Sequence, residues 1–180
     1  MVAVVSDAGP LIHLAQIGKS VLLKKLFGVV LVTEKVKVEF FDEGLRLGCA
    51  DAQAIGEALE DGWLRVEPVP ERLAESAVKL AKGENISRAD AETLLLAVEK
   101  KAVLLVDEKV LSDLAKMYGL QVWSTWTLLL ESLTKDFVGL SEVEGAVDEL
   151  GKRKFTLSTK QAEEILEAAE FIERHKKGIH

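Results

Sequence analysis

The sequence predicts an α/β fold, with a three-layer α/β/α arrangement around a central parallel sheet of about four to five strands. Short runs rich in Val and Leu recur along the chain, separated by turn residues and helical patterns. Runs that are apolar throughout are typical of parallel strands buried on both faces. The regular alternation of strand and helix favours a sheet covered on both sides. The expected strands are residues 2–5, 29–32, 63–66, 102–106 and 120–123.

Turn and capping residues set the bounds of the helices expected in the first third of the chain. The first helix has Pro10 at its first position, where the missing N–H is not needed, and ends at Gly18. The second ends at Gly28, because glycine suits the left-handed conformation in which many helices end. Thr33 is expected to cap a third helix, and Asp51 a fourth.

Capping boxes mark two further helices. Residues 87–90 and 158–161 each begin with serine and carry an acidic or amide side chain three positions later. Two helical patterns, over 141–153 and 158–177, follow one another without a strand between them. We therefore expect a main domain over residues 1–134 and a helical extension over 135–180, packed on it or projecting from it. Other helices are expected over 71–82, 108–119 and from about residue 125.

Composition limits the classes of function without selecting one. The net charge is −7, whereas nucleic-acid affinity usually rests on Lys and Arg that neutralise phosphates. Such a chain suits a nucleic acid only if its carboxylates gather at a metal site or its basic residues share one face. The single cysteine, Cys49, predicts a reducing cytoplasm and a packing role. No apolar run reaches the roughly 18 residues of a membrane span, so no membrane association is expected.

Carboxylates recur where the expected strands end. Asp7 follows the first strand, and Asp107 and Glu108 follow the fourth. Glu39 lies in the helix after the second strand, and Asp90 opens the helix before the fourth. Ligands of parallel sheets bind beyond the carboxyl ends of the strands, so these side chains can meet at one rim. Mg²⁺ and Mn²⁺ prefer such oxygen ligands, and the waters they retain leave room for a substrate phosphate.

Each of these carboxylates also has a purely structural interpretation. Asp7 fits a turn or a helix cap. Asp90 is the acidic member of a capping box, and Asp107 or Glu108 could cap the following helix. Glu39 could belong to an exposed acidic stripe of its helix. Spacing alone therefore leaves both interpretations open.

An ordered set of motifs resembles the PIN domain family over roughly residues 2–133. VVSDAGPLIHLAQIG looks like the family's opening strand, aspartate and helix, and VTEKVKVEFFDE resembles its second element, a valine-rich helix that carries a glutamate. ADAETLLLA, followed by AVLLVDEKVLSDLAKMYGLQVWST, resembles the third and fourth elements. The order of the motifs is more specific than any one of them. The chain most resembles prokaryotic PIN proteins related to VapC toxins, in a subgroup with a DAGPLI start and a helical C-terminal extension.

The resemblance assigns the metal-binding acids of the family to positions in this chain. They correspond to Asp7, Glu39, Asp90 and the Asp107/Glu108 pair. Many relatives have threonine and then aspartate after the fourth strand, which leaves the fourth ligand open here, and we favour Asp107. Candidate outer groups are Asp113, one helical turn farther on, and Ser124 and Thr125, which could bind a phosphate or orient a ligand, although a helix cap is the favoured role for Thr125.

The resemblance implies a metal-dependent endoribonuclease that acts on single-stranded RNA. In VapC-like systems the nuclease is a toxin restrained by an antitoxin and commonly forms a dimer. We therefore expect catalysis by Asp7, Glu39, Asp90 and Asp107, with Glu108 as a further metal ligand and Mg²⁺ or Mn²⁺ as cofactor. The expected partners are the RNA substrate, an antitoxin and a second copy of the chain.

Two alternatives come from other functional classes. One is a non-catalytic PIN-fold module that binds RNA or protein. The other is a small-molecule phosphohydrolase or nucleotide-binding protein, which the lack of a glycine-rich phosphate loop disfavours. His13 is expected to pack or to form a hydrogen bond rather than to catalyse. Basic residues that could guide the RNA backbone, or simply be solvated, are Lys19, Lys24, Lys25, Arg46 and Arg88.

Overall fold

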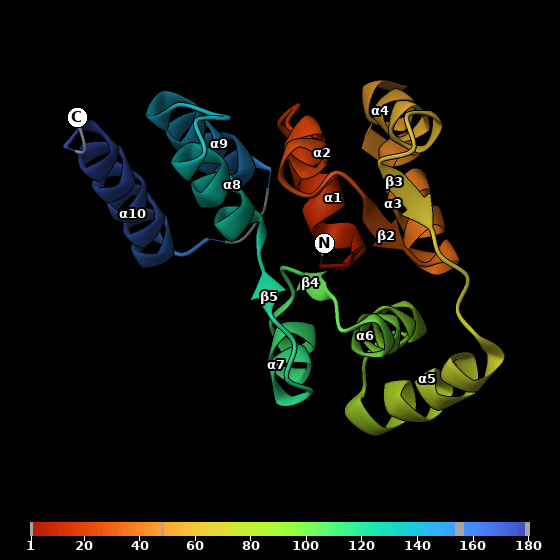
Figure 1. Cartoon of the computed structure of the whole chain (residues 1–180). Coiled ribbons are helices and arrows are strands. Elements are labelled where there is room, and N and C mark those ends of the chain that lie inside the picture. The colour runs from red at the N-terminus through yellow and green to blue at the C-terminus, as the bar shows by residue number, and fades with distance from the viewer. Residues whose placement is uncertain (1, 48, 154–156, 179–180) are drawn as a thin grey trace.

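The computed structural model describes residues 2–47, 49–153 and 157–178, and in these residues five parallel strands form one sheet (Figure 1). The strands are β1 (Val4–Ser6), β2 (Val30–Val32), β3 (Leu64–Val66), β4 (Val103–Leu105) and β5 (Val122–Trp123). Their order is β3-β2-β1-β4-β5, so β1 is central and pairs with both β2 and β4. Val5 of β1 lies opposite Leu31 on one side and Leu104 on the other.

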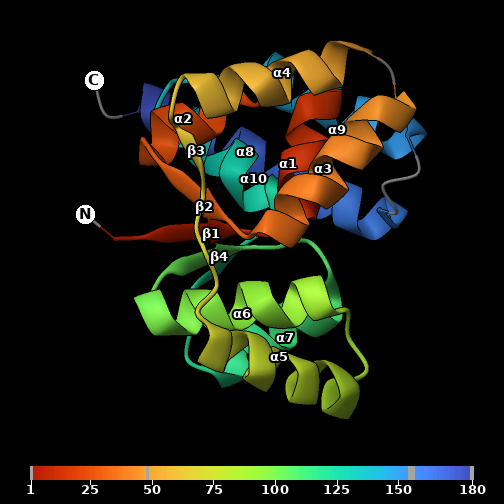
Figure 2. The same cartoon turned by 90° about the vertical axis from the view of Figure 1, so that its right-hand side faces the viewer.

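Helices cover both faces of this sheet. They are α1 (Ala8–Gln16), α2 (Val21–Phe27), α3 (Glu34–Leu47), α4 (Cys49–Glu60), α5 (Glu71–Glu84), α6 (Arg88–Lys100), α7 (Lys109–Met117), α8 (Thr125–Thr134), α9 (Leu140–Lys152) and α10 (Thr159–Lys177). Figure 2 shows α5, α6 and α7 below the sheet and the other helices above it. The expected three-layer α/β/α fold is confirmed. Within the described ranges, no helix is long and apolar enough to cross a membrane.

Side chains that alternate along each strand enter two apolar cores. Val4, Val103 and Leu105 belong to the larger core, which includes residues of α1–α4 and α8–α10. Val5 and Leu104 belong to the smaller core, with residues of α6 and α7. Because both faces of the sheet are buried, every position along a strand favours an apolar side chain. Each fully buried Leu or Val stabilises the fold by roughly 1.5–3 kcal/mol.

Most of the expected helix caps are present. Thr33 Oγ1 accepts a hydrogen bond from the Val36 N–H at 3.2 Å, at the start of α3. Gly28 ends α2 with a φ of 74°, a conformation in which most other residues are strained. Both expected capping boxes, over residues 87–90 and 158–161, are formed. These local patterns therefore predicted the helix bounds well.

Two of the expected helix starts are wrong. Helix α1 begins at Ala8, so Pro10 is its third residue rather than its first. Proline is tolerated there because no N–H in the first turn has an intrahelical partner. Helix α4 begins at Cys49, so Asp51 is its third residue and not its cap. The prediction that Cys49 has a packing role stays a prediction, because its side chain lies outside the part of the molecule that the structure describes.

The C-terminal helices α9 and α10 pack against α8. Their side chains Val143, Leu150 and Ala169 are part of the larger core rather than of a separate one. Near the end of α10, Lys176 Nζ donates a hydrogen bond to the Leu133 carbonyl at 2.8 Å. The extension is thus packed on the sheet domain, whereas the division at residues 134 and 135 remains a prediction.

Candidate functional site

Parallel pairing brings the ends of β1 and β4 together at the carboxyl rim of the sheet. The Asp7 N–H donates a hydrogen bond to the Leu105 carbonyl at 2.9 Å, so Asp7 lies directly beside the end of β4. Asp107 follows β4 by two residues. Asp7 occupies the N-cap position of α1, but its side chain makes no capping hydrogen bond within the part of the chain that the structure describes. The Ala8 and Gly9 backbone N–H groups at the start of α1 nevertheless act on the Asp7 carboxylate and lower its pKa, so the helix-cap and metal-site interpretations of Asp7 both stay predictions.

Asp7 is a buried carboxyl group in an unfavourable electrostatic environment. The residue is only 8% exposed. Burial, together with the negative charges of Asp90 and Glu39, raises the pKa of Asp7 from 3.8 to about 7, against the opposing effect of the Ala8 and Gly9 backbone N–H groups. Three carboxylates from β1, α3 and α6 are thus close enough to interact electrostatically.

Asp107 is held by hydrogen bonds from two other elements. Its Oδ1 accepts from the Thr125 N–H at 2.7 Å, and its Oδ2 accepts from the Thr125 hydroxyl at 2.6 Å. His13 Nδ1 of α1 lies 2.7 Å from the same Oδ2. The expectation that His13 is a hydrogen-bonded residue is confirmed. These contacts fix the orientation of the Asp107 carboxylate.

Thr125 is a positioning residue that sequence reasoning only partly identified. It was expected mainly as a helix cap, and this is wrong, because the N-cap of α8 is Ser124, whose Oγ accepts from the Thr127 N–H at 3.2 Å. Thr125 is completely buried and directs both its N–H and its hydroxyl to Asp107. The contact follows from the pairing of β5 with β4, which places the residues after the two strands close together, and the sequence alone does not give that strand order.

Gly9 lies between the two aspartates that follow the central strands. A Cβ added to Gly9 would lie 3.6 Å from Asp107 Oδ2 and 3.7 Å from Asp7 Oδ2. Glycine at this position thus leaves open the space between the two carboxylates.

The other candidate acids have structural partners. Asp90 accepts from the Ser87 N–H at 3.2 Å in its capping box, although its charge still acts on Asp7. Glu108 is exposed and caps α7, where it accepts from the Leu111 N–H at 2.8 Å.

Two further candidate acids lie on exposed faces of helices. Asp113 pairs with Lys109 at 2.7 Å on the exposed face of α7. Glu39 is also exposed, on α3. The structure thus brings Asp7, Glu39 and Asp90 into electrostatic contact, and it places Asp107 across Gly9 from Asp7.

The donor set suits a hard cation that keeps part of its water shell. Among residues 2–47, 49–153 and 157–178, no three or more His, Cys, Asp or Glu side chains are grouped so that they could hold a metal ion together. Mg²⁺ does not need such a group, because it retains several waters and takes only one or two carboxylates directly. Asp7 is a buried carboxyl group that interacts with two further carboxylates. A cation stabilises the ionised form of such a group. The residues present therefore fit Mg²⁺ or Mn²⁺.

The raised pKa of Asp7 predicts how stability depends on pH in the metal-free protein. Between pH 4 and pH 7 the unfolded chain loses the Asp7 proton while the folded chain keeps it, so the free energy of unfolding falls as pH rises. Asp7→Asn should remove this decline, which amounts to at most about 4 kcal/mol. Urea unfolding at several pH values, with a chelator present, measures it.

Asp113→Asn is the matched control for this measurement. Pairing with Lys109 lowers the pKa of Asp113, so this residue makes the free energy of unfolding rise with pH, which is the opposite of the effect of Asp7. An identical decline in Asp7→Asn and the wild type would contradict the assignment.

Comparison with known proteins agrees with this geometry. A family model described as a PIN domain matches residues 3–171, which is most of the chain and includes the C-terminal helices. No curated protein matches the chain. The match spans every strand of the sheet and all the candidate acids. On this evidence, the chain belongs to the PIN domain family.

Proposed function

We propose that this protein is a metal-dependent endoribonuclease that hydrolyses phosphodiester bonds in single-stranded RNA. One observation carries the proposal: Asp7 is buried at the end of the central strand, with a pKa raised to about 7 by burial and by two neighbouring carboxylates. Perturbed acids of this kind are concentrated at functional sites. Membership of the PIN domain family and the resemblance to VapC-like ribonucleases support the same conclusion.

In this proposal, Asp7, Glu39, Asp90 and Asp107 hold Mg²⁺ or Mn²⁺. A bound ion of this kind polarises a phosphoryl oxygen and lowers the pKa of water. Asp107 is favoured over Glu108 as the fourth ligand, because the Glu108 carboxylate already caps α7.

Other residues of the chain prepare this site. Thr125 and His13 fix the direction of the Asp107 carboxylate, as supporting groups commonly do for metal ligands. The burial of Asp7 excludes water from one side of the site. A toxin-like role, restraint by an antitoxin and assembly as a homodimer are further parts of the proposal, and they rest on the VapC-like sequence motifs.

A second candidate function is a PIN-fold module that binds RNA or protein without cleaving it. The spacing of the acids favours it, since within the described parts of the chain they do not enclose a metal ion. Metal binding without cleavage of any RNA would distinguish this module from the nuclease.

The nuclease proposal predicts that cleavage requires Asp7. A labelled single-stranded RNA pool should be cut by the wild type in Mn²⁺ or Mg²⁺ and not in chelator. Asp7→Asn should reduce the rate at least about a hundredfold, because the buried ligand loses its charge. Gel electrophoresis of the products measures the rate.

Asp113→Asn is the control, since this aspartate is exposed on α7 and paired with Lys109. It should cleave at the wild-type rate. Equal cleavage by wild type and Asp7→Asn would exclude Asp7 from the mechanism and point to a contaminating nuclease.

Gly9→Ala is predicted to weaken metal binding without damaging the fold. The added methyl group meets both aspartates at ordinary van der Waals distances of 3.6 and 3.7 Å, and alanine is the better helix former in α1. It nevertheless occupies the space between the two carboxylates, so the dissociation constant for Mn²⁺ should rise about tenfold. Calorimetric titration with Mn²⁺ measures this constant.

The control is Gly145→Ala in α9, where an added Cβ meets no described atom within 4 Å. Its Mn²⁺ affinity should equal that of the wild type. Wild-type affinity in Gly9→Ala would show that the cation does not lie between Asp7 and Asp107.

A further inference from the structure

A second charged cluster lies beside the acidic site and is centred on Glu92. The Glu92 side chain is only 5% exposed, in helix α6. Its Oε1 accepts from Arg88 Nε at 3.0 Å, one turn earlier in the same helix, and lies 3.4 Å from Lys35 Nζ of α3. Buried ion pairs contribute little net stability, because desolvation offsets much of the attraction. The cluster therefore calls for an explanation other than stability.

The two cationic side chains of this cluster, Lys35 and Arg88, are exposed to solvent, whereas the Glu92 carboxylate that they share is buried. The Lys35 and Arg88 side chains are 43% and 52% exposed. Two positive charges share one carboxylate, so the cluster has a net positive charge at the surface. The bond to Glu92 uses the Nε–H of Arg88, and its Nη groups are the fork that recognises phosphate in pairs of hydrogen bonds. Glu92 thus holds two cations in place and leaves their outer faces toward solvent.

This cluster adjoins Glu39, one of the carboxylates that act on Asp7, through helix α3. Lys35 precedes Glu39 by four residues and therefore lies on the same face of α3. Both line a surface groove of about 640 Å³, together with Glu34, Val38, Asp42 and Arg46. On α6, Arg88 and Asp90 share the first turn but lie on different faces, so α3 provides the link between the cluster and the acidic site. A nucleic acid whose scissile phosphate lies at the acidic site would have its neighbouring phosphates near these cations.

We propose that Lys35 and Arg88, positioned by Glu92, bind a backbone phosphate of single-stranded RNA next to the acidic site. This inference rests on the proposed ribonuclease function and adds the residues that hold the substrate. A chain with a net charge of −7 repels RNA overall, and the acidic site repels it locally. A fixed pair of cations beside that site supplies a local attraction that opposes this repulsion.

The test compares single variants in binding to a fluorescein-labelled oligouridylate by anisotropy, with Ca²⁺ in place of Mg²⁺ and at a series of KCl concentrations. Lys35→Gln and Arg88→Gln should each raise the dissociation constant about five- to tenfold at low salt, and should make its salt dependence shallower. Mn²⁺ affinity should stay at the wild-type value. Single variants are used because each leaves Glu92 with one cationic partner, which preserves the fold.

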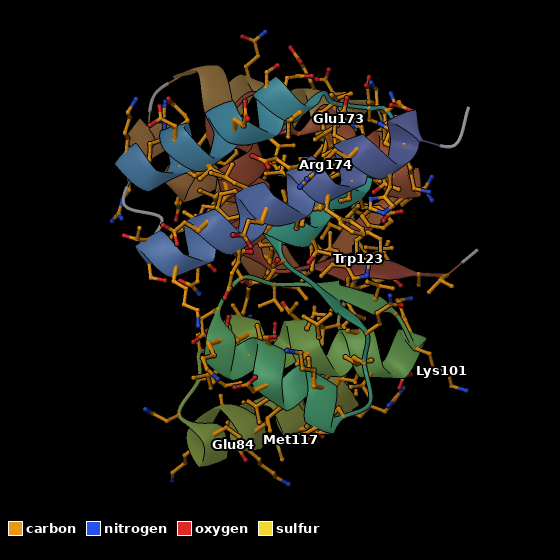
Figure 3. The ribbon with its side chains drawn as sticks, turned by 90° about the vertical axis from the view of Figure 1, so that its left-hand side faces the viewer. Glu84, Lys101, Met117, Trp123, Glu173 and Arg174 are labelled. Atoms are coloured by element: carbon orange, nitrogen blue, oxygen red, sulfur yellow. The ribbon has the colours of Figure 1, made fainter. Side chains whose placement is uncertain are left out.

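Lys101→Gln is the matched control, at the opposite end of α6 from Arg88 (Figure 3). It should bind RNA with the wild-type dissociation constant and salt dependence. Arg88→Lys retains the charge but not the guanidinium fork, so it should recover only part of the affinity lost in Arg88→Gln.

The outcomes separate this inference from the proposed function. If the wild type binds and cleaves RNA but Lys35→Gln and Arg88→Gln behave like Lys101→Gln, the phosphate site is overturned and the nuclease stands. If the wild type binds Mn²⁺ but neither binds nor cleaves RNA, the proposed function fails and the phosphate site fails with it.

Discussion

The parallel pairing of β1 with β4 is the constraint on which the candidate site depends. Its register aligns Ser6 with Leu105, so the residues that follow each strand emerge at the same rim. Asp7 and Asp107 reach that rim from segments about a hundred positions apart in the sequence. The space between them stays open because Gly9 has no side chain. The apolar cores on both faces of the sheet stabilise this pairing. The acids of α3 and α6 act on Asp7 because these two helices pack near the carboxyl end of β1.

The arrangement around Asp7 opposes the stability of the metal-free fold. A buried carboxylate next to two others is costly to ionise, and its raised pKa records that cost. Asp107 is the opposite case, since Thr125 and His13 supply the hydrogen bonds that a buried carboxylate needs. One aspartate is therefore fixed in place, and the other is left in an environment where a cation would stabilise its ionised form. Proteins commonly lose some stability at groups that are suited to function.

The sequence predicted local features better than contacts between distant segments. Strand runs, the Thr33 cap and both capping boxes depend on neighbouring residues, and they were found from period and spacing. The start of α1 was missed because proline is tolerated throughout the first helical turn. The link from Thr125 to Asp107 needed the strand order, and the approach of Lys35 to Glu92 needed the packing of α3 on α6. Neither contact leaves a periodic signal in the sequence.

The central claim is that the carboxyl rim of the sheet binds a divalent cation. Anomalous diffraction from crystals of the wild-type protein grown with Mn²⁺ tests it most directly. The account predicts a single strong peak about 2.1 Å from a carboxylate oxygen of Asp7, on the side that faces Asp107. A strong Mn²⁺ peak elsewhere in the molecule, with none at Asp7, would contradict the account.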